Sequence, residues 1–185
     1  MTGPAPLTYP LSGFLGEPPG ERRIYPVHGV TIQLPDDLHL AEPIEGRVEV
    51  ARTNRGVLVE AHLHTSIEAS CSRCLRDIDV PLEVDIDEEV LPSVDIASGA
   101  ALDPSSEPDV ARLTDHHELE LGTLVGEAIS LAEPIAPLCE AACPGLCVTC
   151  GERLGPGHAA HPEDDIDPRL AALRAFQVDG ADETG

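Results

Sequence analysis

Apolar and polar residues alternate with period two over most of residues 48–87. Val48 and Val50 alternate with charged residues, and after a turn signal at 53–56 the alternation resumes and runs on to Cys71. From 78 to 86 every even position is apolar, and the odd positions hold acids or Pro81. This pattern predicts half-buried strands with one apolar and one acidic face, and the proline favours an edge strand. Two strands joined at residues 71–74 would form a hairpin with Cys-x-x-Cys at its tip.

A helical pattern follows a loop at 92–116. Apolar residues recur at i, i+3, i+4, i+7 and i+8, at Leu121, Leu124, Val125, Ala128, Ile129 and Ala132. The spacing predicts an amphipathic helix around 118–132, capped by Thr114 or Asp115 and ended by Pro134. An antiparallel sheet over about 28–90 that packs on this helix makes an α+β fold. A second, short helix is predicted from Arg169 to Phe176, after the Asp-Pro pair at 167–168.

Three parts of the chain are predicted from these patterns. Residues 1–27 form a Pro/Gly-rich N-terminal arm with one short strand. Residues 28–176 form the α+β domain, in which 139–161 is a knuckle region rich in Cys and His. Residues 177–185 form an acidic tail.

The charge of the chain narrows the classes of partner. The 185 residues include 34 acids and 11 bases, and all the bases are Arg, so the formal net charge is −23. Such an acidic protein is unsuited to sequence-independent binding of DNA, RNA or an anionic membrane. The excess is uneven: residues 77–120 hold 14 acids and one Arg, whereas residues 45–76 hold five Arg and four Glu.

Neither a secretory signal nor a membrane span is apparent in the sequence. The first basic residue is Arg22, and no run reaches the roughly 18 apolar residues that a span needs. We therefore expect a cytoplasmic protein, in which the six cysteines are reduced thiols or metal ligands rather than disulfides.

The cysteines and two histidines have the spacing of metal ligands. Zinc binds four Cys or His ligands, which short turns supply in pairs. The simplest division gives two zinc sites: Cys71, Cys74, Cys139 and Cys143 in one, and Cys147, Cys150, His158 and His161 in the other. A rival division joins the two Cys-x-x-Cys pairs in one ribbon, and a third interpretation leaves all six thiols without metal. A redox role is disfavoured, because the first pair lies between strands rather than at a helix N-terminus.

Four short motifs identify a resemblance. They are Cys-Ser-Arg-Cys-Leu at 71–75, Ile-Ala-Pro-Leu-Cys at 135–139, Gly-Leu-Cys-Val-Thr-Cys-Gly at 145–151 and Ile-Asp-Pro-Arg-Leu at 166–170. Together they make the chain resemble the YceD family, described as large-subunit ribosomal RNA accumulation proteins, over roughly residues 25–176. The family's first Cys pair corresponds to Cys71 and Cys74. A second Cys cluster, present in a subgroup of the family, corresponds to Cys139–Cys150. His158 and His161 stand where many relatives have further Cys.

The resemblance implies a cytosolic, non-enzymatic accessory factor for 23S rRNA accumulation, processing and large-subunit assembly, with no catalytic residues. The chain also lacks Ser-His-Asp, Walker and dinucleotide signatures. Arg73 and Arg76 flank the first thiol pair and are candidate contacts to RNA phosphates or a partner protein, unless they pair with acids such as Asp77. An alternative is a zinc-stabilised acidic module that holds a basic ribosomal protein. The sequence leaves open which ribosomal component is the partner.

Overall fold

The structure is a computed structural model that describes residues 7–35, 37–95, 98–103, 105, 107–159, 161 and 169. The chain divides into two compact units. The larger contains the sheet and the helix, up to Cys139, and the smaller contains Arg73–Leu75 together with the residues that follow Cys139.

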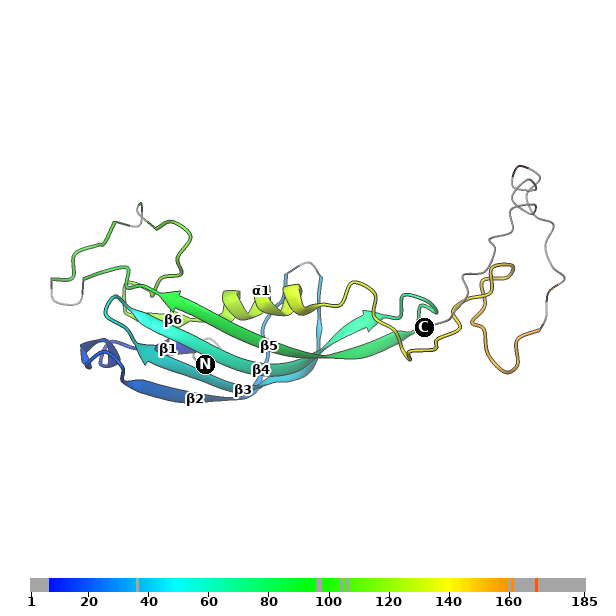
Figure 1. The fold of residues 1–185 in the computed structure, drawn as a ribbon, viewed down its shortest axis with the longest axis horizontal. Helices are drawn as coiled ribbons and strands as arrows, with labels where there is room; N and C mark the ends of the chain where they lie inside the picture. The colour runs from blue at the N-terminus through cyan, green and yellow to red at the C-terminus, as the bar shows by residue number, and fades with distance from the viewer. Residues whose placement is uncertain are drawn as a thin grey trace, which may run out of the picture. The chain divides into compact units, whose positions relative to one another are not determined.

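A four-stranded antiparallel sheet forms the body of the larger unit (Figure 1). Its strand order is β2-β3-β4-β5. The strands are β2 (Arg22–Val30), β3 (Leu40–Arg52), β4 (Val57–Ser70) and β5 (Asp77–Val90). The alternation found in the sequence accounts for β4 and β5, whose inward side chains are buried and whose outward ones are largely exposed. Strand β5, which contains Pro81, lies at the edge as predicted.

The hairpin β4–β5 carries the first Cys-x-x-Cys pair at its tip. The strands pair in unbroken register from Val57 opposite Val90 to Ser70 opposite Asp77. A backbone hydrogen bond of 2.8 Å from the N–H of Cys71 to the carbonyl of Arg76 closes the tip. The sequence prediction of a hairpin ending in two thiols is therefore confirmed.

Helix α1 (Gly122–Ala132) is shorter than predicted. Residues Glu118–Glu120 instead form a short strand, β6, which pairs with β1 (Thr8–Pro10) in a separate two-stranded sheet. The N-cap is Leu121, without a side-chain cap, so the expected capping by Thr114 or Asp115 is wrong. The helix does end just before Pro134. It packs beside β5 (Figure 1).

The core is almost entirely aliphatic, and it includes residues from the N-terminal segment. The buried face of α1 contributes Val125 and Ile129. Within residues 1–27, expected to be an arm with one short strand, Leu11, Phe14 and Leu15 are buried in the same core. Their burial could not be read from the sequence, because they show no period that marks a strand or a helix. The α+β class itself is confirmed.

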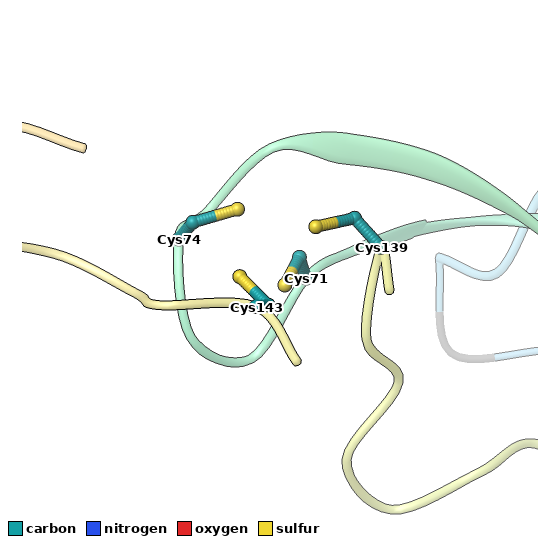
Figure 2. Close-up of side chains that lie close together, drawn as sticks. All are labelled: Cys71, Cys74, Cys139 and Cys143. Carbon is teal, nitrogen blue, oxygen red and sulfur yellow. The ribbon is translucent and has the colours of Figure 1, made fainter. Parts of the chain in front are cut away.

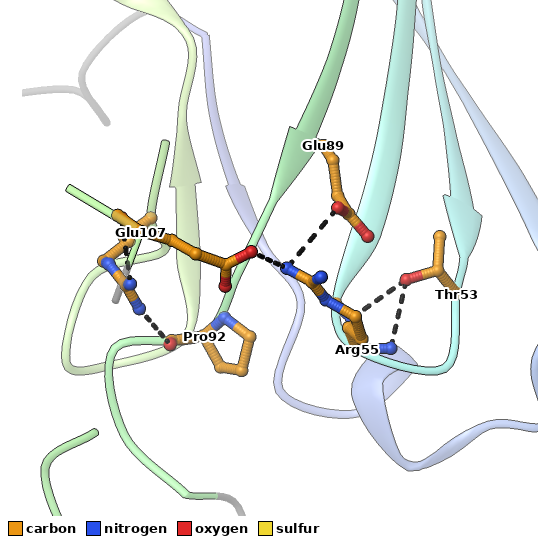
Figure 3. A network of polar contacts seen from close by, with 7 residues as sticks. Thr53, Arg55, Glu89, Pro92 and Glu107 are labelled. Atoms are coloured by element: carbon orange, nitrogen blue, oxygen red, sulfur yellow. Dashed lines mark hydrogen bonds and ion pairs between the residues drawn. The ribbon is translucent and has the colours of Figure 1, made fainter. Parts of the chain in front are cut away.

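The long loop after β5 is anchored to the turn between β3 and β4 (Figure 3). The Arg55 guanidinium forms ion pairs with Glu107 at 2.7 Å and with Glu89 at 3.7 Å. The Arg112 guanidinium donates to the carbonyl of Pro92 and to that of Glu107, each at 3.4 Å. The ion pairs of Arg55 are exposed and the hydrogen bonds of Arg112 are part-buried, and together they hold the loop against the end of the sheet.

Two predictions lie outside the described residues. They are the short helix from Arg169 to Phe176, of which Arg169 alone is described, and the acidic tail at 177–185. No helix in the described part of the chain is long and apolar enough to cross a membrane.

Candidate metal centres

The first candidate metal centre consists of four cysteine sulfurs gathered at the tip of the β4–β5 hairpin. The Sγ atoms of this cysteine cluster all lie within 4.8 Å of one another, and they point toward a common centre (Figure 2). Three of the side chains are buried, and Cys139 is part-exposed. The members are Cys71, Cys74, Cys139 and Cys143.

Local hydrogen bonds explain how segments distant in the sequence come together here. After α1, Pro134 and Pro137 interrupt helical structure, and the chain runs back toward the hairpin tip. The N–H of Ser72 donates to the carbonyl of Pro137 at 2.9 Å, two residues before Cys139. The Arg73 Nη1 donates to the carbonyl of Cys143 at 3.0 Å. These hydrogen bonds hold Cys139 and Cys143 next to the hairpin turn.

The donor set and its spacing fit a closed zinc site. Four thiolates at about 2.3 Å from zinc in a tetrahedron have sulfurs about 3.8 Å apart, so the observed spread needs only a small contraction. Burial suits this chemistry, because uncompensated thiolates in an apolar site would repel one another and a divalent cation removes that cost. Four protein ligands also leave no position for a substrate or water.

The second candidate centre, which we call the mixed cluster, combines two thiols and two imidazoles. One ligand atom of each of its residues lies within 4.8 Å of the others. The Sγ of Cys150 is 3.3 Å from the Nε2 of His158. This cluster is more open than the cysteine cluster, since Cys150 is exposed. Its members are Cys147, Cys150, His158 and His161.

A tight turn shapes the thiol half of the mixed cluster. The N–H of Gly151 donates to the carbonyl of Cys147 at 2.9 Å, and Gly151 has a φ of 74°, which favours glycine. Backbone N–H groups of Cys150 and Thr149 point at the sulfur of Cys147 and lower the pKa of that thiol. Stabilising the thiolate in this way prepares the sulfur to bind a metal.

The structure brings the eight predicted ligands together in the division that the sequence spacing favoured. The rival ribbon, which would join Cys71 and Cys74 to Cys147 and Cys150, does not appear among the clusters of described residues.

Arg73 and Arg76, the predicted contacts to RNA or a partner, have different surroundings at the hairpin tip. Arg73 is engaged by the carbonyl of Cys143, which gives it a structural contact. Arg76 is exposed and forms no ion pair with any described residue, so the anticipated pairing with Asp77 is not seen. Sequence reasoning missed Arg153, whose Nε and Nη2 donate to the carbonyls of Cys74 at 2.9 Å and Leu75 at 3.1 Å. Nothing in the spacing of the motifs marks that residue.

The fold and the two clusters define the class: an α+β protein with a long antiparallel hairpin and two Cys/His centres able to hold a metal ion. The chain belongs to the family described as "Large ribosomal RNA subunit accumulation protein YceD", whose model matches residues 59–177. That match covers β4 from its third residue, all of β5 and α1, and both clusters. Family membership supports a ribosome-related role for the chain.

One curated relative is the "Uncharacterized protein ML1660" of Mycobacterium leprae (strain TN). The two sequences are 29% identical over 133 residues, which is 71% of this chain and 58% of the relative. The chain therefore spans less than two thirds of the length of that protein. No solved structure matches the chain.

Proposed function

We propose that the chain is a non-enzymatic accessory factor for the accumulation of 23S rRNA, acting in its processing and in assembly of the large ribosomal subunit in the cytoplasm. The observation that carries this proposal is the family match over residues 59–177. The fold contributes a second argument: both chemistry-bearing clusters have four ligands each, a composition typical of closed structural metal sites rather than catalytic ones.

Zinc is the metal that the two donor sets favour. Cys71, Cys74, Cys139 and Cys143 would hold one ion, and the mixed cluster of Cys147, Cys150, His158 and His161 a second. Thiolate and imidazole ligands in sets of four select zinc over magnesium or calcium, which prefer oxygen. Bound zinc supplies a cross-link that stabilises the fold. Arg73 and Arg153 hold the backbone of the surrounding loops through carbonyl groups.

A depletion strain tests the proposed function. Loss of the protein should lower 23S rRNA relative to 16S rRNA and reduce the large-subunit peak in a sucrose gradient, and expression of the intact chain should restore both. A Cys71→Ser/Cys74→Ser variant should fail to restore them. Normal 23S levels and normal subunit profiles after depletion would refute the proposal.

A second candidate function rests on the outward face of β5. Its residues Asp77, Asp79, Glu83, Asp85 and Asp87 are all exposed. Such a face is unsuited to RNA phosphate but suited to a cationic protein, so the chain would hold a basic ribosomal protein before assembly. Copurification from cell extract in high salt distinguishes the two: rRNA in the eluate supports direct contact with RNA, and a basic protein without rRNA supports the second function.

A further inference from the structure

The outer edge of β5 is a long strand edge with backbone groups that no strand covers. β5 has 14 residues and pairs with β4 alone in the part of the chain that the structure describes. Before Pro81, which has no N–H, this edge presents N–H and C=O groups on which a further strand can be added, beside the groove described next. A second copy of β5 is a poor candidate for that position, because its row of carboxylates would face the same charges.

A groove lies beside the first residues of this edge. It has a volume of about 430 Å³, and its lining includes Ile78 and Val80 of β5 and Pro134, Pro137 and Leu138 of the segment after α1. Both residues from β5 are part-buried, with side chains on the face opposite to the carboxylates. The groove therefore places these apolar side chains beside the strand edge, and Asp79, Pro81 and Cys139 complete its lining.

The acidic face above the groove is largely uncompensated. The carboxylate of Asp85 lies 2.6 Å from the imidazole of His62, and Asp77 accepts a hydrogen bond of 3.4 Å from the hydroxyl of Ser70. Asp79, Glu83 and Asp87 have no ion pair with any residue that the structure describes. Lys and Arg on a neighbouring strand would lie directly opposite such carboxylates, at the distance where opposite charges stabilise pairing.

We propose that the edge of β5 and the adjoining groove bind an extended cationic segment of a protein, added as a further strand. This inference rests on the second candidate function and specifies its partner. Side chains of an added strand alternate between the two faces of the sheet. The segment therefore has Lys or Arg at every second position, facing the carboxylates, and apolar residues between them, facing Ile78, Val80 and Leu138.

Fluorescence anisotropy with a labelled peptide of alternating Lys and Val tests the proposal on the full chain. The variant Asp79→Asn/Glu83→Gln/Asp87→Asn should bind about tenfold more weakly than the wild type, which corresponds to about 1.4 kcal/mol. The matched control removes three charges elsewhere on the same unit, Glu21→Gln/Glu120→Gln/Glu127→Gln, and should leave the affinity unchanged.

Two modified peptides separate strand addition from general charge attraction. A peptide with the same composition but all Lys residues in one block should bind at least about fivefold more weakly, because half of its side chains then face the wrong side. N-methylation of alternate amides should abolish binding when the methyl groups lie on the edge that faces β5, and should leave it intact when they lie on the other edge.

The outcomes decide the proposal. Equal binding of the block peptide, equal weakening by both triple variants, or displacement of the peptide by a single-stranded RNA would overturn it. Rescue of 23S rRNA in the depletion strain is measured in parallel. Rescue by a protein that does not bind the peptide leaves the proposed function standing and refutes the strand-addition site alone.

Discussion

Truncation of Ile129 to alanine is the sharpest test of how α1 packs on the sheet. Ile129 is 1% exposed and belongs to the core cluster that includes the inward residues of β4 and β5. Ile129→Ala removes roughly three methylene-sized groups, a transfer loss of about 2.4 kcal/mol at ~0.8 kcal/mol each. A residual cavity adds to this loss, and measured costs of such truncations are about 2–5 kcal/mol.

We therefore expect the free energy of unfolding to fall by about 3.5 kcal/mol and the melting temperature by about 7–14 °C for a chain of this size. Leu131 provides a control on the same helix, since its side chain is 88% exposed. Leu131→Ala should change the unfolding free energy by less than about 0.5 kcal/mol.

Urea titration and thermal melts followed by circular dichroism measure both variants. Helix propensity favours alanine over either residue, so it cannot produce a loss at one position and none at the other. A loss below about 1 kcal/mol for Ile129→Ala, or equal losses for both variants, would refute the packing of α1 on the sheet.

Three further predictions concern the metal centres, a glycine in β3 and an ion pair. Cys71→Ser should lose about one zinc equivalent in elemental analysis and lower the melting temperature of the whole protein, since zinc at about 1,000 times its Kd contributes ~4.1 kcal/mol. His158→Ala should also lose zinc but change the melting temperature less. Fewer than about 0.1 zinc equivalents in the wild type, with all six thiols titrating in the native state, would contradict both expectations. Gly46→Ala should destabilise by about 1–3 kcal/mol in urea titrations, because φ is 141° there and the added Cβ would overlap a backbone carbonyl of β4; an unchanged midpoint would contradict this. A hydrogen bond from His28 lowers the pKa of Glu45 from 4.5. This carboxylate therefore stabilises the fold above pH 4.5, and the stabilisation is lost as the pH falls through the lower pKa of the folded state. Glu45→Gln should lower the melting temperature near pH 7 but not near pH 3, and equal losses at both pH values would refute the assignment.

The alternation of residues by itself identified β4 and β5, but not β2, most of which falls within residues 1–27 that were predicted to form an arm. A strand with one buried face must place apolar residues at every second position, so the pattern from 78 to 86 identified β5, its inward face and its acidic outer face. The proline on that outer face also identified the edge position. The thiol pair between two such strands could lie nowhere except at the hairpin tip, and spacing favoured the same two ligand groups that the structure brings together.

The pairing of the two shortest strands and the start of α1 depended on contacts that produce no periodic pattern in the sequence. The pairing of β1 with β6 joins two strands of three residues from distant parts of the chain, and three residues are too few to show alternation. Residues 118–120 pair with β1 as strand β6, so α1 begins only at Gly122.

Only the tertiary structure decided which arginines near the thiols hold the surrounding loops in place. Arg73 and Arg153 donate to backbone carbonyls beside the cysteine cluster, whereas Arg76 stays exposed. A guanidinium has the same chemistry at all three positions, and the sequence cannot tell which carbonyls lie within its reach. Local alternation fixes which face of a strand is buried, but the partners of a long polar side chain are fixed only when segments far apart in the chain meet.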